Sequence, residues 1–168
     1  PTAARSGRGV SLALAAGFEA EFGQRTASDA LARRLSDGDI GERAGTHAKR
    51  IVDVVVTHRV TIDERIEEVA PTYPVVQLAR IDRSLLRCGV GELLHCPTTP
   101  ARVAISEWVE LARTYSGEPT RRLMNGALGR VAQQAAQSEG TERDDPSPPG
   151  PESTTDIVTT AHTEGPAE

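Results

Sequence analysis

Large apolar residues recur at every third or fourth position along most of this chain, and this spacing constrains the fold more than any other feature of the sequence. Such spacing places apolar side chains on one face of an α-helix. The first stripe contains Val10, Leu14, Phe18 and Phe22, and Gly23 ends it. No alternating run long enough for a β-strand is present. The sequence therefore predicts an all-α fold.

Six further helices are predicted from the same spacing. They are expected to begin at or near Ser28, Gly41, Thr61, Leu78, Thr99 and Pro119. Ser28 and Thr99 are predicted N-caps, because a hydroxyl there can accept a hydrogen bond from a free backbone N–H. Pro100 then takes the first helical position. Thr61 and Glu64 have the spacing of a capping box. The prediction is therefore about seven helices.

The last part of the chain has a different composition. Residues 138–168 contain eight acidic residues, one basic residue and five prolines. We expect this segment to be a disordered acidic tail, since it holds too little apolar surface to offset the entropy of ordering. An acidic tail can mimic RNA, but this composition is more typical of a solubilising extension. Residues 5–137 are predicted to form the helical domain.

Charge and cysteine content limit the classes of protein to consider. The formal net charge is −5, yet the chain before the tail holds 18 basic and 16 acidic residues. A nucleic-acid partner is therefore permitted but not indicated by charge. No apolar run approaches the roughly 20 residues of a membrane span, and no signal sequence is present. Cys88 and Cys96 make no disulfide framework, so we expect a protein of the reducing cytoplasm.

No motif for catalysis, metal binding or a cofactor is found. The sequence contains no HExxH, CxxC, GxxxxGK[ST], GxGxxG or GxSxG pattern. Cys88, His95 and Cys96 are near one another but lack a fourth zinc ligand. Glu107 and Glu110 are better explained as a solvated helix face. The chain is therefore predicted not to be an enzyme and to need neither a metal nor another cofactor.

Two arginine pairs are candidate phosphate contacts. Arg5 and Arg8 lie in a segment of small residues, expected to be an N-terminal arm, and Arg121 and Arg122 lie in the first turn of the last predicted helix. Guanidinium groups and free N–H groups at a helix start both bind phosphate. Aromatic residues are too sparse for an RRM-like stacking platform.

Four segments carry a family resemblance, in the family's order and at ungapped spacing. They are IDRSLLR at 81–87, GELL at 91–94, VAISEWVELARTY at 103–115 and LMNGAL at 123–128. With the first helix around residues 14–22, they resemble the NusB family of transcription antitermination factors. The resemblance covers roughly residues 5–135.

The resemblance implies two packed three-helix bundles and a non-catalytic RNA-binding adaptor. Members bind boxA-type RNA in the leader of ribosomal RNA transcripts, together with the ribosomal protein that acts as NusE. That assembly joins the elongating RNA polymerase and suppresses premature termination. Some members self-associate, so a homodimer is a further expectation.

The resemblance also assigns site residues. The family's RNA contacts correspond in this sequence to Arg5, Arg8, Arg121 and Arg122. The family's NusE contacts correspond to Phe18, Phe22 and Asp82. With four phosphate contacts, a plot of the logarithm of the binding constant against the logarithm of the salt concentration should have a slope of about −3. RNA binding without the partner should therefore be weak. Two questions stay open: Asp82 can contact a partner or form a local salt bridge, and Arg83 and Arg87 can form a basic face or pair with nearby acids.

Two alternative functions fit the same helical pattern. Similar domains target RNA in ribosomal RNA cytosine methyltransferases, which need a following cofactor-binding domain with a glycine-rich loop. A helical scaffold that oligomerises without binding RNA is the other alternative, because the basic arm holds only Arg5 and Arg8.

Overall fold

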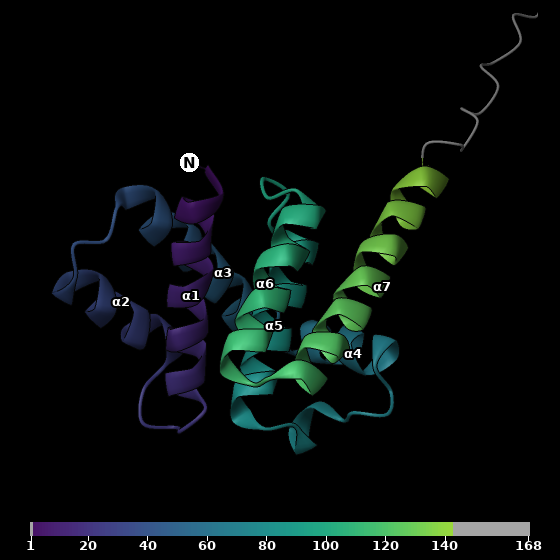
Figure 1. Cartoon of the computed structure of the whole chain (residues 1–168), viewed down its shortest axis with the longest axis horizontal. Helices are drawn as coiled ribbons and strands as arrows, with labels where there is room; N and C mark the ends of the chain where they lie inside the picture. Colours follow the sequence, from purple (N-terminus) through teal and green to yellow (C-terminus); the bar gives the residue numbers. More distant parts are fainter. Residues whose placement is uncertain (1, 143–168) are drawn as a thin grey trace, which may run out of the picture.

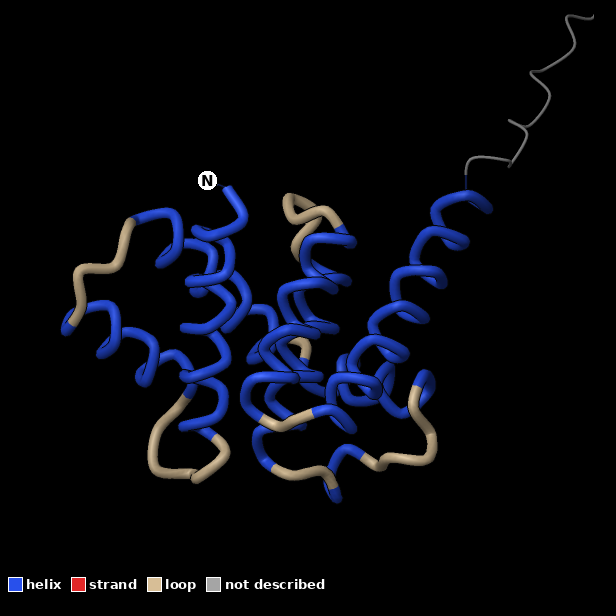
Figure 2. Tube along the Cα trace, viewed as in Figure 1, coloured by secondary structure: helices blue, strands red, loops and turns tan. Residues whose placement is uncertain are grey.

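Every regular element that the computed structural model describes, over residues 2–142, is a helix (Figures 1 and 2). The elements are α1 (Thr2–Ala20), α2 (Ala27–Asp37), α3 (Glu42–Thr57), α4 (Arg59–Val69), the short 3₁₀ helix η1 (Val75–Gln77), α5 (Arg80–His95), α6 (Ala101–Tyr115) and α7 (Glu118–Glu142). The predicted all-α fold with seven α-helices is confirmed. None of these helices combines the length and apolar character needed to cross a membrane.

The helices form two packed bundles, as the resemblance implied. Helices α1, α2 and α3 pack on one another, and α5, α6 and α7 do the same. The two groups meet where α1 and α3 contact α5, while α4 packs against both α5 and α7. Figure 1 shows α5 and α6 between α1 and α7.

Helix α5 lies at the centre of the core. Its residues from Ser84 to Glu92 are all buried, and Trp108 of α6 is fully buried beside them. Two glycines let neighbouring helices approach. A Cβ at Gly89 would lie 3.2 Å from Leu128, and one at Gly91 would lie 3.2 Å from Ile62. Close packing of α4 and α7 on α5 therefore depends on these small residues.

Two predicted N-terminal caps are wrong. The N-cap of α2 is Thr26, two residues before the predicted cap, because the Thr26 hydroxyl accepts from the Asp29 N–H at 3.1 Å, and Ser28 lies inside the helix. Helix α4 begins at Arg59 rather than after Thr61. The Thr61 hydroxyl donates to the His58 carbonyl at 3.0 Å, so it forms no capping box. Only His58 separates α3 from α4, so the same residue ends one helix and begins the next.

Three other boundaries differ from the predictions. Pro100 is the N-cap of α6 and Thr99 precedes it. Helix α1 begins at Thr2, so Arg5 and Arg8 lie on a helix and not on an extended arm. Helix α7 continues to Glu142, past the predicted domain end at residue 137. The rest of the segment expected to be disordered, residues 143–168, lies outside the described residues.

Candidate RNA-binding and partner-binding surfaces

Arg83 and Arg87 form a buried ion-pair network and not a basic face. Arg87 donates through Nε and Nη2 to the two carboxylate oxygens of Asp63, at 2.7 and 2.8 Å. Its Nη1 donates to Glu21 at 2.6 Å, and Arg83 pairs with the other oxygen of Glu21 at 2.6 Å. Burial opposes the charge of Arg87, but Asp63 and Glu21 raise its pKa above the ordinary value. This network ties the turn after α1 to α4 and α5.

Asp82 lies at the start of α5 and is bonded to the connection between α6 and α7. Its Oδ1 accepts from the Ser116 hydroxyl and, at 3.2 Å, from the Thr120 hydroxyl. No base within the described part of the chain pairs with it. The local salt bridge considered from the sequence is therefore wrong. Contact between Asp82 and a partner stays a prediction.

The first predicted stripe is only partly buried. Val10 and Leu14 are in the core, Phe18 is half-buried and Phe22 is 52% exposed. The reason is that α1 ends at Ala20, which places Phe22 in the following turn. The rings of Phe18 and Phe22 contact edge to face at 5.2 Å, and the guanidinium of Arg80 lies 4.8 Å from the Phe22 ring centre.

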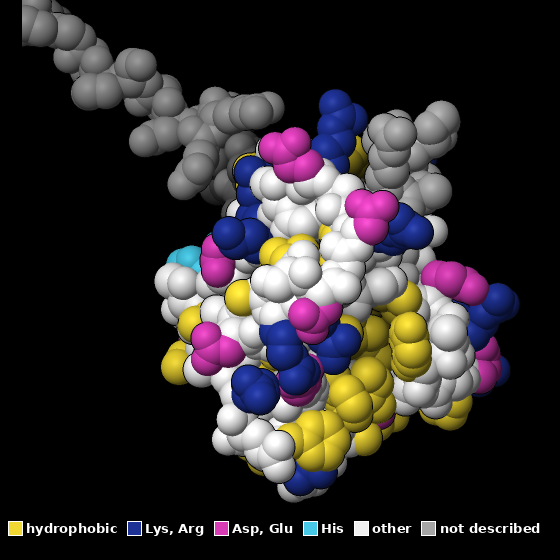
Figure 3. Space-filling model, turned by 90° about the vertical axis from the view of Figure 1, so that its left-hand side faces the viewer, with side chains coloured by type: hydrophobic (Ala, Val, Ile, Leu, Met, Phe, Trp, Pro, Cys, Tyr) yellow, Lys and Arg dark blue, Asp and Glu magenta, His cyan; other side chains and the backbone are white. Residues whose placement is uncertain are grey.

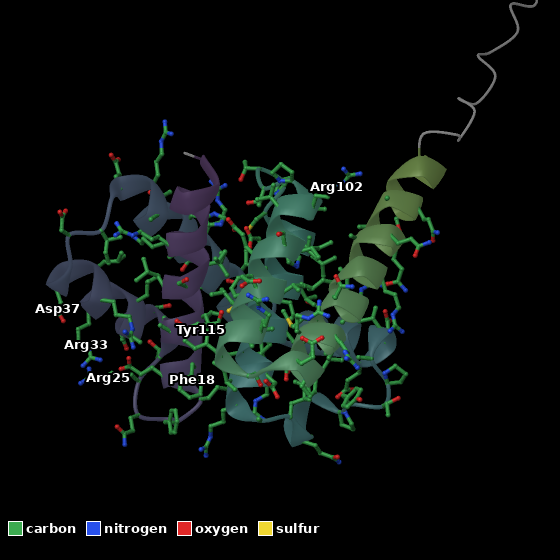
Figure 4. The ribbon with its side chains drawn as sticks, in the orientation of Figure 1. Phe18, Arg25, Arg33, Asp37, Arg102 and Tyr115 are labelled. Atoms are coloured by element: carbon green, nitrogen blue, oxygen red, sulfur yellow. The ribbon has the colours of Figure 1, made fainter. Side chains whose placement is uncertain are left out.

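An apolar groove runs beside these rings. It has a volume of about 530 Å³ and is lined by Ser11, Leu14, Ala15, Phe18, Glu19, Phe22, Arg34, Ile81 and Tyr115. Figure 3 shows hydrophobic side chains gathered next to a group of charged ones on this face, and Figure 4 shows Phe18 and Tyr115 with Arg25 and Arg33 beyond them. We call these lining residues the aromatic groove.

Charged residues border the aromatic groove on the side of α2. Glu19 accepts from Arg33 at 2.8 Å and from Arg34 at 3.0 Å, and Arg25 lies 3.9 Å away. Three guanidinium groups around one carboxylate leave an excess of positive charge at this edge. The surface therefore offers apolar contact and positive charge side by side.

The two predicted arginine pairs have different surroundings. Arg8 is exposed on α1 and lines a cavity with the start of α3, and the side chain of Arg5 is outside the described residues. Arg121 and Arg122 both donate to Glu118, at 2.7 and 3.2 Å. The hydrogen bond from Arg121, helped by Arg122, lowers the pKa of Glu118 to about 2.

The structure does not bring these two pairs together. Figure 1 shows α1 and α7 beginning at opposite ends of the molecule. Arg8 precedes the last residue of α1 by 12 positions, which is about 18 Å along a helix. The two predicted pairs therefore do not form one cluster, and an RNA touching both must run along the molecule.

The sequence analysis missed a buried polar contact at the centre. Glu92 is fully buried on α5 and accepts from the indole Nε1 of Trp108 at 2.7 Å, and His47 Nε2 of α3 lies 2.9 Å from its other oxygen. The sequence did offer a signal for this contact, because Glu92 is an acidic residue inside an apolar run. This contact joins the two bundles.

Metal-binding groups and reactive thiols are two further kinds of site to consider among the described residues. No group of three or more His, Cys, Asp or Glu among them is arranged to hold a metal. Burial raises the pKa of the Cys88 and Cys96 thiols to about 12 and about 11. A thiol with such a pKa is a poor nucleophile.

Comparisons with known proteins agree with the resemblance. The NusB family model matches residues 10–133. Transcription antitermination protein NusB of Dehalococcoides mccartyi strain CBDB1 is 35% identical over 127 residues, covering 76% of this chain and 89% of the relative. The NusB of Leifsonia xyli is 34% identical over 129 residues, covering 75% and 90%.

Solved structures show the same fold. T. maritima NusB superposes with a TM-score of 0.72 at 27% identity, covering 81% of this chain and 96% of that one. A chain in a crystal structure of antitermination factors NusB and NusE in complex with dsRNA has a TM-score of 0.68 at 22% identity, covering 79% and 98%. The latter likeness concerns the fold alone.

Proposed function

Because this chain belongs to the NusB family, we propose that it is a non-catalytic antitermination factor that binds boxA-type leader RNA of ribosomal RNA operons together with NusE. In this role it joins the RNA polymerase elongation complex in the cytoplasm and suppresses premature termination. The observation that carries the proposal is the family match from residue 10 to residue 133, which spans both helical bundles.

The aromatic groove supports a protein partner. Phe22 exposes half of its surface, and Tyr115 of α6 is more than half exposed on the same groove. Large exposed aromatic side chains next to arginines are typical of protein interfaces, because they add much apolar area for little loss of conformational entropy. We assign the NusE contact to this groove through Phe18 and Phe22, with Asp82 at the start of α5.

Exposed arginines support the RNA contact. Arg8 and Arg122 are exposed, and Arg121 is half-buried at the start of α7. Each binds phosphate by charge and by its planar set of donors. Arg121 and Arg122 must share their donors between RNA and Glu118, which weakens their contribution. We include Arg5 from the family pattern.

Fluorescence anisotropy tests the proposal. The full chain is titrated into labelled boxA-type RNA, with and without purified NusE, at two salt concentrations. We expect weak binding by the chain alone and tighter binding with NusE, with affinity falling as salt rises. A scrambled RNA is the control for sequence. No binding under any of these conditions would overturn the proposal.

A double variant, Arg5→Ala with Arg8→Ala, tests the scaffold alternative. We expect its RNA affinity to fall, whereas an oligomerising scaffold predicts no change. Size-exclusion chromatography of the same samples shows whether the oligomeric state depends on these residues.

A further inference from the structure

Two cavities lie next to each other where α1 and α3 begin. One, of about 300 Å³, is lined by Arg8, Gly41, Glu42, Arg43 and Ala44. The other, of about 360 Å³, is lined by Glu42, Arg43, Thr46, His47 and Arg50. Because Glu42 and Arg43 border both, the two cavities form one surface from α1 across the first turns of α3. Figure 1 shows both helices starting at this end.

The basic residues of this surface share one face of α3. Arg43, His47 and Arg50 are spaced i, i+4 and i+7, so their side chains lie on one stripe. Arg43 and Arg50 are separated by about 10 Å along the helix axis. The neighbouring stripe, which includes Ala48 and Ile51, is buried. The core therefore fixes the direction in which the basic stripe points.

The arginines of this surface have no acidic partner, a state that they share, among the described residues, with Arg80, Arg102 and Arg130. Within the part of the chain that the structure describes, no carboxylate pairs with Arg8, Arg43 or Arg50. Arg121 and Arg122 are instead held by Glu118. The positive charge of the surface at α3 is therefore available to a ligand. Among the described residues, Glu42 is the one acidic residue that lines the two cavities.

Two contacts hold the surface in position. Arg50 donates through Nη1 to the Thr98 hydroxyl at 2.8 Å, which fixes its guanidinium against the connection between α5 and α6. A guanidinium has five donors, so most of its donors stay available. His47 is anchored by its contact with buried Glu92. At the other end, no side chain caps the α3 N-terminus at Gly41, so its backbone N–H groups also favour an anion.

We propose that Arg43 and Arg50, together with Arg8, form the phosphate-binding surface that holds single-stranded RNA on this protein. The inference rests on the proposed function and deepens it, since it moves the main basic contact from the start of α7 to α3. Three guanidinium groups at one end, of which none is paired with an acid, suit a chain of phosphates better than the paired arginines of α7 do.

The test compares matched double variants of the full chain. Arg43→Ala with Arg50→Ala removes the surface, and Arg113→Ala with Arg130→Ala removes the same charge from exposed positions on α6 and α7. Arg43→Lys with Arg50→Lys keeps the charge. Anisotropy of labelled boxA-type RNA is measured with NusE across a salt series, and circular dichroism confirms that each variant is helical.

The proposal predicts a loss of affinity of about tenfold for the Arg43→Ala, Arg50→Ala variant, and a salt slope shallower by about 1.4, which is 0.7 for each lost phosphate contact. The lysine variant should keep the slope and the control variant should bind as the unaltered chain does. Equal affinity and slope in the alanine and control variants would overturn this inference while leaving the proposed function intact. Failure of the unaltered chain to bind RNA would overturn both.

Discussion

Replacing Arg87 by methionine tests the ion-pair network that joins the turn after α1 to α4 and α5. The side chain of Arg87 is 6% exposed, and its guanidinium joins Asp63 to Glu21. Methionine keeps much of the apolar stem but leaves two carboxylates without this partner. Removing one member of a buried pair costs about 3–5 kcal/mol. Because Asp63 is partly exposed and Glu21 keeps Arg83, we expect the lower end, about 3 kcal/mol.

Urea unfolding followed by circular dichroism measures this loss, and thermal unfolding should show a Tm lower by roughly 10 °C. Arg113→Ala is the matched control. Arg113 pairs with Glu110 at 2.8 Å on an exposed face, so its removal should change stability by less than about 1 kcal/mol. Equal losses in the two variants would refute the argument that burial gives the Arg87 network its importance.

Three further predictions concern single sites. Phe22→Ala should leave the free energy of unfolding within about 1 kcal/mol of the unaltered value, because the ring is half exposed, while calorimetry should show weaker binding of NusE. Arg121→Ala with Arg122→Ala should raise the pKa of Glu118 from about 2 toward its ordinary value, as measured by carboxyl NMR titration. In the unaltered chain the stabilisation from these pairs is present above the ordinary pKa and is lost as pH falls toward 2; an unchanged Glu118 titration in the variant would contradict the pairing. Gly89→Ala should destabilise the fold by about 1–3 kcal/mol in urea, because its Cβ would press on α7 and α6.

The number and type of helices could be predicted because amphipathic spacing depends on local sequence. Helix α5 is central because its apolar face is wide, and the run from Ser84 to Glu92 is buried. Hydrophobic spacing reports burial directly, so this level of structure needs no knowledge of long-range contacts.

Helix ends were harder to predict because neighbouring residues compete for the same role. Thr26 and Ser28 both offer a capping hydroxyl, and the structure uses Thr26. Thr61 has the capping-box spacing, but α3 and α4 follow one another with only His58 between them. Tertiary packing decides such cases, since a cap is worth only about 1 kcal/mol.

Some charged residues pair with neighbours in the sequence, and others pair with residues far away along the chain. The pairing of Arg121 and Arg122 with Glu118 spans three and four positions on one helix, a spacing that allows such pairs, although the sequence analysis did not predict it. The pairing of Arg83 and Arg87 with Glu21 joins residues more than 60 positions apart, and no spacing rule contains it. The unpaired state of Arg43 and Arg50 is likewise visible only in three dimensions.

Terminator readthrough during transcription in vitro measures antitermination by this chain. Bacterial RNA polymerase transcribes a template with a boxA-type leader ahead of a terminator, in the presence of NusE and the other antitermination factors, and this chain is added last. Readthrough should rise when the chain is added, and mutation of the leader element should remove the rise. Readthrough that stays constant on the intact leader would contradict the assignment of this chain as an antitermination factor.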